Sequence, residues 1–231
     1  GVSEATDTLD LAFIIPDFLF YLSAGGYLAI TLIPIMSEKK KSELNNYFLS
    51  ILYGMSLIFV IFSLITYSFR FQFAELLGVT SLDFFVEVFT PIIFSQVFFF
   101  VGAILMSYQY FHDNFKYAAI APVVYNSTII FFGWINSSTP EGTIKGFAIG
   151  TLIGSVLGHF LIQIYGAKRS GLSFYLISPK FVHIKNYITI SLPLILGQSI
   201  AVIDEQLFRI FGSFLAAGSI ATFRYARRIA L

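Results

Sequence analysis

The chain has 231 residues, of which 57% are hydrophobic and only 12% are charged, and 14 basic against 13 acidic side chains give a net charge of +1. The share of charged residues is about half of that in soluble domains. The 28 Phe and 13 Tyr side chains have more aromatic surface than a soluble fold of this size can keep from water. The small net charge argues against nucleic-acid binding, and the absence of cysteine excludes disulfides, zinc ribbons, iron–sulfur clusters and thiol catalysis. This composition is that of a polytopic membrane protein.

Several apolar segments are long enough to cross a bilayer core of about 30 Å, which requires roughly 20 residues of helix. In chain order they cover residues 11–36, 47–69, 88–110, 117–135, 146–165 and 187–211, and a further helix begins near Gly218. Pro16, Gly25-Gly26 and Pro34 predict a kinked or partly unwound first span. Pro91 stands near the expected start of the third span, where proline is tolerated. We therefore expect an all-α transmembrane bundle of six complete spans and a truncated seventh.

The fifth span has a stripe of small residues, with Gly146, Gly150, Gly154 and Gly158 repeating every fourth position. Such a stripe lets the backbone of another helix approach closely. It predicts helix packing rather than a ligand site.

The loops differ in their Lys and Arg content, which indicates the orientation of the spans. Loops on one side carry Lys39, Lys40, Lys41, Lys116, Lys168, Arg169, Lys180 and Lys185, whereas those on the other side carry only Arg70 and Lys145. Loops 37–46 and 166–186 are therefore predicted to be cytoplasmic, with Gly1 on the outer face. An outside start without an initiator Met predicts at least one helix upstream, in a longer protein.

Acidic residues in the first span are costly in a membrane and therefore informative. Asp7, Asp10 and Asp17 fall within about an 80° arc of a helix that begins near residue 6. Asp7 and Asp10 fit either a functional face or an exposed first turn with Thr6 as its N-cap. Asp17 is deeper and follows Pro16, so we expect it to face a water-filled cavity.

The sixth span contains Asp204, Glu205 and Arg209, which are candidates for ion coupling. Glu205 and Arg209 are four residues apart with the acid first, the favourable order for a helical ion pair, so mutual neutralisation is the simplest interpretation. Asp204 lies on a different face and needs a cation, a proton or another helix.

Arg224, Arg227 and Arg228 occupy about a 100° arc of the truncated helix. Three guanidinium groups on one face suit a multiply charged anion such as a diphosphate. The alternative is a cluster that contacts lipid headgroups, but this helix starts on the outer face, where bases are otherwise scarce. No hydrolase, metalloprotease or P-loop motif occurs, the three histidines are far apart, and His112-Asp113 fits a solvated turn. Neither a metal site nor an enzyme is predicted.

Three segments, in order, resemble one family. "GVSEATDTLDLAFIIPDFLFYLSAGGYLAITLIPIMSEKK" resembles the second span of the MurJ/MviN lipid II flippases, "YFHDNFKYAAIAPVVYN" is similar to the turn before their fifth span and the start of that span, and "SLPLILGQSIAVIDEQLFRIFGSFLAAGSIATFRYARRIAL" resembles their seventh span and the start of the eighth. The matching positions are Gly1, Thr6, Asp7, Ala12, Phe13, Pro16, Gly26 and Pro34, then Pro193, Gly197, residues 214–219, Tyr225, Ala226 and Arg228.

This resemblance implies the fold of the multidrug/oligosaccharidyl-lipid/polysaccharide exporters, with two helical lobes around a V-shaped cavity. Residues 1–186 would be five spans of the N-terminal lobe, and residues 187–231 would open the second lobe. The implied function is to move lipid II, an undecaprenyl-pyrophosphate-linked precursor of peptidoglycan, from the inner to the outer leaflet of the bacterial cytoplasmic membrane. The family's functional acid falls on Asp7 and a cavity arginine that holds pyrophosphate falls on Arg228.

The resemblance implies no cofactor beyond coupling to Na⁺, H⁺ or the membrane potential. The implied partners are the lipid-linked saccharide, membrane lipids and the cell-wall synthesis machinery, with no nucleic acid.

The chain departs from the family pattern at Phe20 and Tyr21, where many members have arginines, and at Gly25 and Phe208, where acids are common. These departures keep open a flippase for O-antigen or exopolysaccharide repeats. A cation-coupled drug exporter using Asp17 or Asp204 is a further alternative, against which the arginine face counts. Two alternatives are not transporters: a membrane-embedded glycosyltransferase and a sensor scaffold. The glycosyltransferase would need a large extramembrane domain or a loop of clustered carboxylates, and this chain has neither.

Overall fold

The computed structural model describes residues 4–23, 27–216 and 218–230, and all the regular secondary structure within them is helical. The elements are α1 (Glu4–Ala12), α2 (Ile14–Ser23), α3 (Tyr27–Ser37), α4 (Lys41–Ser68), α5 (Arg70–Leu76), α6 (Leu82–Phe111), α7 (Lys116–Ile135), α8 (Pro140–Gly154), the π-helix η1 (Ser155–Leu161), α9 (Ile162–Arg169), α10 (Phe181–Gly212) and α11 (Ser219–Ala230). The predicted all-α fold class is therefore confirmed.

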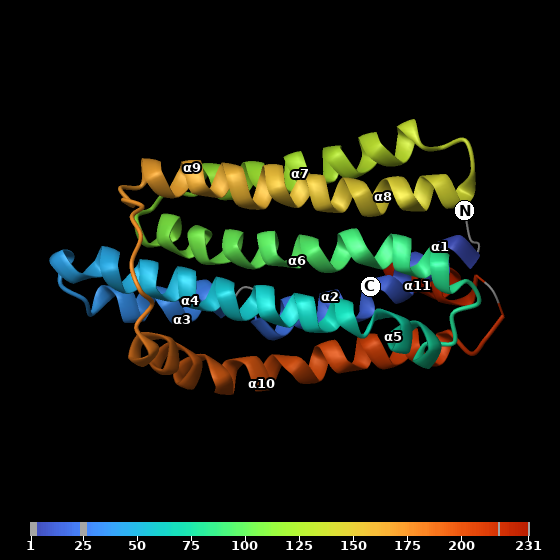
Figure 1. Cartoon of the computed structure of the whole chain (residues 1–231), viewed down its shortest axis with the longest axis horizontal. Helices are drawn as coiled ribbons and strands as arrows, with labels where there is room; N and C mark the ends of the chain where they lie inside the picture. The colour runs from blue at the N-terminus through green and yellow to red at the C-terminus, as the bar shows by residue number, and fades with distance from the viewer. Residues whose placement is uncertain (1–3, 24–26, 217, 231) are drawn as a thin grey trace.

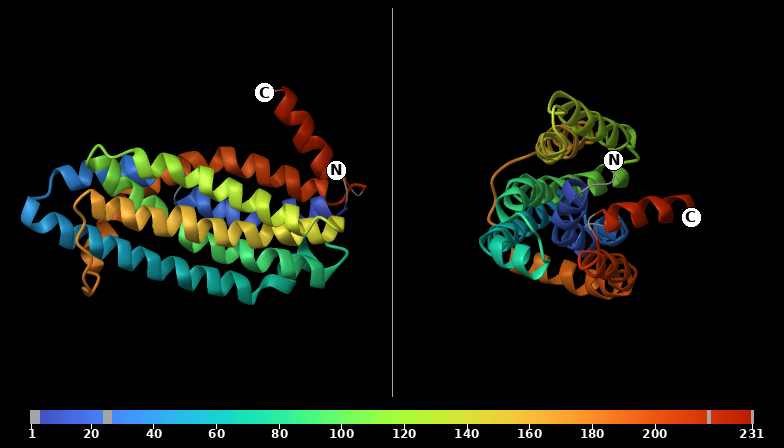
Figure 2. Two further views of the ribbon diagram at one scale, coloured as in Figure 1. Left: turned by 90° about the horizontal axis from the view of Figure 1, so that it is seen from above. Right: turned by 90° about the vertical axis from the view of Figure 1, so that its right-hand side faces the viewer.

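The long helices run side by side along one axis and form a bundle (Figure 1). α6 lies at its centre, where it contacts α3 and α4 on one side and α8 and η1 on the other. α10 packs against α2, α3 and α4, whereas α11 leaves the bundle at an angle (Figure 2). The core around α6 is rich in phenylalanine, and the rings of Phe59 and Phe100 stack with their centroids 4.0 Å apart.

The first span is broken, as its prolines predict. α1 ends at Ala12, four residues before Pro16. Pro16 has no N–H to donate to the Ala12 carbonyl, and its ring crowds that carbonyl, so the helix is interrupted there. The expected start at residue 11 was too late, because α1 already includes Glu4, and Thr6 lies within this helix instead of capping it. Gly25 and Gly26 lie outside the described residues.

Two further expectations need correction at the end of the bundle where α5 lies. α6 begins at Leu82 instead of Val88, because buried Phe85 extends its apolar face, and Pro91 is therefore inside the helix. The short helix α5 was not predicted. It is held beside α4 by Arg70, whose guanidinium lies 4.2 Å from the ring centroid of Tyr67.

The glycine stripe packs against α7, as expected. A Cβ atom on Gly146 would lie 2.3 Å from the Phe132 carbonyl oxygen, one on Gly150 2.7 Å from the Ile129 Cα, and one on Gly158 2.6 Å from the Ala121 carbonyl oxygen. These close approaches are to backbone atoms that cannot move away, so only glycine permits this contact of α7 with α8 and η1.

The long helices have the properties of membrane spans. Within the described residues, Lys41–Ser68, Leu82–Phe111, Lys116–Ile135 and Pro140–Arg169 have the length and hydropathy required to cross a bilayer. Their outer surface is apolar: on α7, the side chains of Val123, Ile130 and Trp134 are 65–71% exposed. The chain is therefore a multi-pass membrane protein.

Three features of the expected topology stay predictions: the total of six complete spans, the orientation and the lobe boundary after residue 186. α10 begins at Phe181, before that boundary, and packs against helices assigned to the first lobe. Because successive long helices are antiparallel, the turns 38–40, 112–115 and 170–180 lie at one end of the bundle (Figure 1). The bases predicted to be cytoplasmic are in or beside these turns.

Candidate functional site

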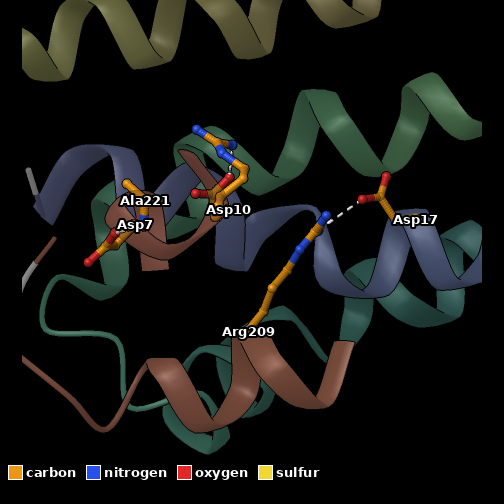
Figure 3. A network of polar contacts seen from close by, with 6 residues as sticks. Asp7, Asp10, Asp17, Arg209 and Ala221 are labelled. Carbon is orange, nitrogen blue, oxygen red and sulfur yellow. Dashed lines mark hydrogen bonds and ion pairs between the residues drawn. The ribbon is translucent and has the colours of Figure 1, made fainter. Parts of the chain in front are cut away.

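The acids of the first span face α10 and α11 across the interior of the bundle (Figure 3). Asp7 and Asp10 are on α1 and Asp17 is on α2, while their partners come from the last 25 residues of the chain. Asp7 is 9% exposed and Asp10 is 3% exposed. The alternative of an exposed first turn is therefore wrong, because both side chains are buried beneath α11.

Asp7 binds the start of α11. The backbone N–H of Ala221 donates to Asp7 Oδ1 at 3.0 Å, and the N–H of Gly218 donates to Asp7 Oδ2. The first N–H groups of a helix have no partner within the helix, and its N-terminus favours negative charge. Gly218 has φ +86°, a conformation that glycine adopts at little cost. Asp7 thus fixes where α11 begins and how it leaves α10.

Asp10 pairs with Arg224. One guanidinium nitrogen of Arg224, Nη1, contacts Asp10 Oδ1. The Asp10 side chain is 4% exposed and that of Arg224 is 37% exposed, so the arginine reaches from a wetter region into the buried acid. Asp10 Oδ2 has no hydrogen-bond partner among the described residues. One carboxylate oxygen is therefore left without compensation in a buried position.

Asp17 pairs with Arg209. Arg209 Nη1 lies 2.9 Å from Asp17 Oδ2, and the two side chains are 13% and 27% exposed. Asp17 was expected to face a water-filled cavity, and the structure gives it a cation from α10. The predicted Glu205–Arg209 pair cannot be followed, since the side chains of Asp204 and Glu205 lie outside the described part of the structure.

The arginine face of α11 is described only at its beginning. Arg224 is placed, whereas Arg227 and Arg228 belong to the helix but their side chains lie outside the described residues. Of the groups singled out in the sequence, the structure brings together Asp7 with the N-terminus of α11, Asp17 with Arg209, and Arg224 with an acid of the first span. The roles of all these residues stay predictions.

Asp10 shared the two interpretations of Asp7 and lies on the same predicted arc as Asp7 and Asp17, but it was not predicted to bind substrate or an ion. Its three-residue spacing from Asp7 was the available signal. What the sequence lacks is any indication that α11 folds back over α1, more than 200 positions away in the chain. Among the described residues, no group of three or more His, Asp or Glu side chains is placed to hold a metal ion.

Ionisable residues inside a membrane protein are rare and mark substrate or ion pathways. The chain is thus a multi-pass helical membrane protein in which two acid–arginine pairs join the first span to α10 and α11, and such interior charges are typical of substrate or ion pathways.

The sequence model of the family described as "Lipid II flippase MurJ" matches residues 1–231, and the chain belongs to this family. A curated relative, the lipid II flippase MurJ of Thermosipho africanus (strain TCF52B), is 30% identical over 169 residues, which are 70% of this chain and 34% of the relative. A solved structure described as "Lipid II flippase MurJ, inward closed conformation" matches all of this chain and 49% of its own, with a TM-score of 0.81 and 25% identity. The chain thus spans at most about half the length of these relatives.

Proposed function

We propose that this chain is part of a transporter that moves lipid II from the cytoplasmic to the outer leaflet of the bacterial inner membrane. The observation that carries the proposal is Arg224, held by the buried Asp10 at the edge of the bundle interior, in a chain of the MurJ family. A guanidinium group binds phosphate oxygens through a planar fork of N–H donors, which suits the pyrophosphate of a polyprenyl-linked saccharide. The protein is proposed to act as a transporter and not as an enzyme.

The acid–arginine pairs supply a mechanism of counter-ion exchange. Without substrate, Asp10 neutralises Arg224 and Asp17 neutralises Arg209. A pyrophosphate that takes over Arg224 leaves Asp10 without its cation in a site that is 3% exposed. An unpaired buried charge is costly, so substrate binding is coupled to uptake of a proton or a cation by the acid. Release of the substrate restores the ion pair.

The same arrangement assigns separate tasks to the remaining candidates. Asp7 holds the start of α11 and so positions Arg224. Arg227 and Arg228 continue the arginine series of α11 and are proposed to complete the pyrophosphate site, and Asp204 and Glu205 are proposed to take part in ion coupling. The saccharide, the coupling ion and contacts with cell-wall synthesis machinery are part of the proposal.

The test uses the full-length protein with Arg228→Ala and Arg228→Lys, scored by complementation of a strain depleted of its own lipid II flippase at matched membrane abundance. Losing one charge-assisted contact of about 1.5–3 kcal/mol lowers substrate affinity roughly ten- to hundredfold. Lysine is expected to restore only part of the activity, because an ammonium group lacks the bidentate fork.

Full complementation by the alanine variant would refute a pyrophosphate role for Arg228 and favour contact with lipid headgroups. Binding of lipid II to the purified protein is compared with binding of an undecaprenyl pyrophosphate that carries an O-antigen repeat. Preference for the O-antigen carrier would favour the polysaccharide flippases of the same superfamily.

A further inference from the structure

An apolar groove of about 550 Å³ lies between α4 and the beginning of α10, away from the acid–arginine pairs. It has the size of a site for a small molecule or a lipid chain. Its walls include Leu57 and Ile58 of α4 and Phe181 and Ile188 of α10, and its one charged lining residue among those described is Lys185.

The groove is a built feature of the α4–α10 contact. The Lys180 N–H donates to Ser50 Oγ at 2.6 Å, and the Tyr53 hydroxyl donates to the Tyr175 carbonyl oxygen at 3.1 Å. These bonds fix the start of α10 against the middle of α4. Gly54 then lets Ile184 approach, since a Cβ atom there would lie 2.2 Å from Ile184 Cδ1. The bottom of the groove is thus closed by buried packing.

The groove opens to the outside of the bundle. Leu57, Ile58 and Phe181 are 58%, 42% and 74% exposed, although they are large and apolar. In a multi-pass membrane protein such a surface faces lipid acyl chains. A lipid acyl chain of the bilayer can therefore enter the groove between the described side chains of α4 and α10.

The end of the groove at the start of α10 is basic. Among the described residues, no carboxylate pairs with Lys185 or with Lys180, the residue before α10. Lys39 adds a third charge nearby: its Nζ lies 4.8 Å from the ring centroid of Tyr47, and that ring lies 4.8 Å from the ring of His183. This is the end of the bundle where the lysine-rich turns lie. Basic pockets between helices at the cytoplasmic side of a membrane suit phosphate headgroups.

We propose that this groove binds an anionic phospholipid, with one acyl chain between α4 and α10 and its phosphate at Lys185 and Lys180. The apolar walls and unpaired lysines match the two parts of such a lipid. This site is separate from the proposed pyrophosphate site and does not depend on which substrate the protein transports.

The test places the full-length protein in phosphatidylcholine nanodiscs with a small fraction of phosphatidylglycerol that carries a photoactivatable diazirine on one acyl chain. After illumination, the labelled peptides are mapped by mass spectrometry. We expect labels on the segments around Leu57 and Ile188, and more label from the phosphatidylglycerol probe than from a phosphatidylcholine probe.

Variants then test the charge. Near a membrane surface one basic side chain contributes about a fivefold change in binding of an anionic lipid, so Lys185→Ala should lower labelling about fivefold and Lys185→Glu about thirtyfold. Lys185→Arg should retain it. Lys168→Glu makes the same charge change at the same end of the bundle but outside the groove, and is the matched control. Ile58→Trp, at an exposed position, should block labelling by volume alone.

Three outcomes overturn the proposal. Equal labelling by phosphatidylcholine, unchanged in Lys185→Glu, would mean that ordinary boundary lipid occupies the groove. Displacement of the probe by undecaprenyl pyrophosphate but not by unlabelled phosphatidylglycerol would assign the groove to a polyprenyl chain. Cross-links at these segments to a second copy of the protein would make the groove a protein interface. If the Lys185→Glu protein does not accumulate, the proposal is still tested in two ways: by comparing the two lipid probes on the unchanged protein, and by the labelling of the Ile58→Trp variant.

Discussion

Asp10 and Arg224 form the most unequal ion pair of the site, because one side chain is buried and the other is more than a third exposed. Replacing Asp10 by Asn removes the charge that compensates Arg224 and is expected to lower the free energy of unfolding by about 1.5–3 kcal/mol, the range for hydrogen bonds to charged groups. The measurement is thermal unfolding of the full-length protein in detergent. The double variant Asp10→Asn with Arg224→Gln should recover part of the loss.

The matched control is the pair of Glu87 and Lys145, whose side chains are 55% and 42% exposed. Exposed pairs contribute little, so Glu87→Gln should change stability by less than about 1 kcal/mol. If Asp10→Asn and Glu87→Gln change the stability equally, burial of Asp10 does not strengthen its ion pair with Arg224.

Asp17 and Arg209 provide a charge-reversal test at the residue scale. Either single change, Asp17→Arg or Arg209→Asp, is expected to abolish transport because two like charges then face each other. The double variant Asp17→Arg with Arg209→Asp should restore a substantial part of the activity, because it forms the same ion pair, separated by 2.9 Å in the native protein, with the acid and the base exchanged.

The competing interpretation is that Arg209 pairs with Glu205, which lies four residues earlier on the same helix, α10. If Glu205→Arg with Arg209→Glu restores activity and the reversal with Asp17 does not, Glu205 is the principal partner of Arg209. Complementation at matched abundance distinguishes the two pairs.

The contact of α7 with α8 is an element-scale feature that a single added atom would disturb. Gly150→Val places a branched side chain where the first added carbon already lies 2.7 Å from the backbone Cα of Ile129. Overpacking of this kind costs about 1–3 kcal/mol, so a lower thermal unfolding temperature is expected. Gly197→Ala on α10 is the control, because no atom lies within 4 Å of the added carbon. A stable Gly150→Val protein would show that α7 can shift on α8.

At the scale of the whole molecule, the orientation is open to a direct test because the chain has no native cysteine. Single cysteines at Ser42 and Ser170 should be inaccessible to an impermeant thiol reagent in intact cells, whereas one at Ser138 should be labelled. The reason is the excess of Lys and Arg at the end of the bundle that carries Ser42 and Ser170. Labelling at Ser42 would reverse the orientation and remove the arginine face of α11 from the outer end of the bundle.

The length of the apolar segments predicted each of the long helices that the structure describes, because a span in lipid must satisfy its backbone hydrogen bonds internally. The helix ends were predicted less well. α6 starts before Val88 and α5 was missed, since polar residues near the membrane surface interrupt the apolar pattern without interrupting the helix. The π-helix η1 has no signal in the sequence either. It packs beside α6 and α7.

The amino-acid sequence was sufficient to predict an all-helical membrane protein, an interruption of its first span at Pro16, close helix packing at its glycines, and a need of partners for the charges inside its apolar segments. These properties follow from composition and local spacing. The partner of each charge is visible only once the helices are packed: Asp7 binds the start of α11, Asp10 binds Arg224 and Asp17 binds Arg209. Such pairs join residues about 200 positions apart, and their identity depends on how α10 and α11 pack across α1 and α2, which no local pattern encodes.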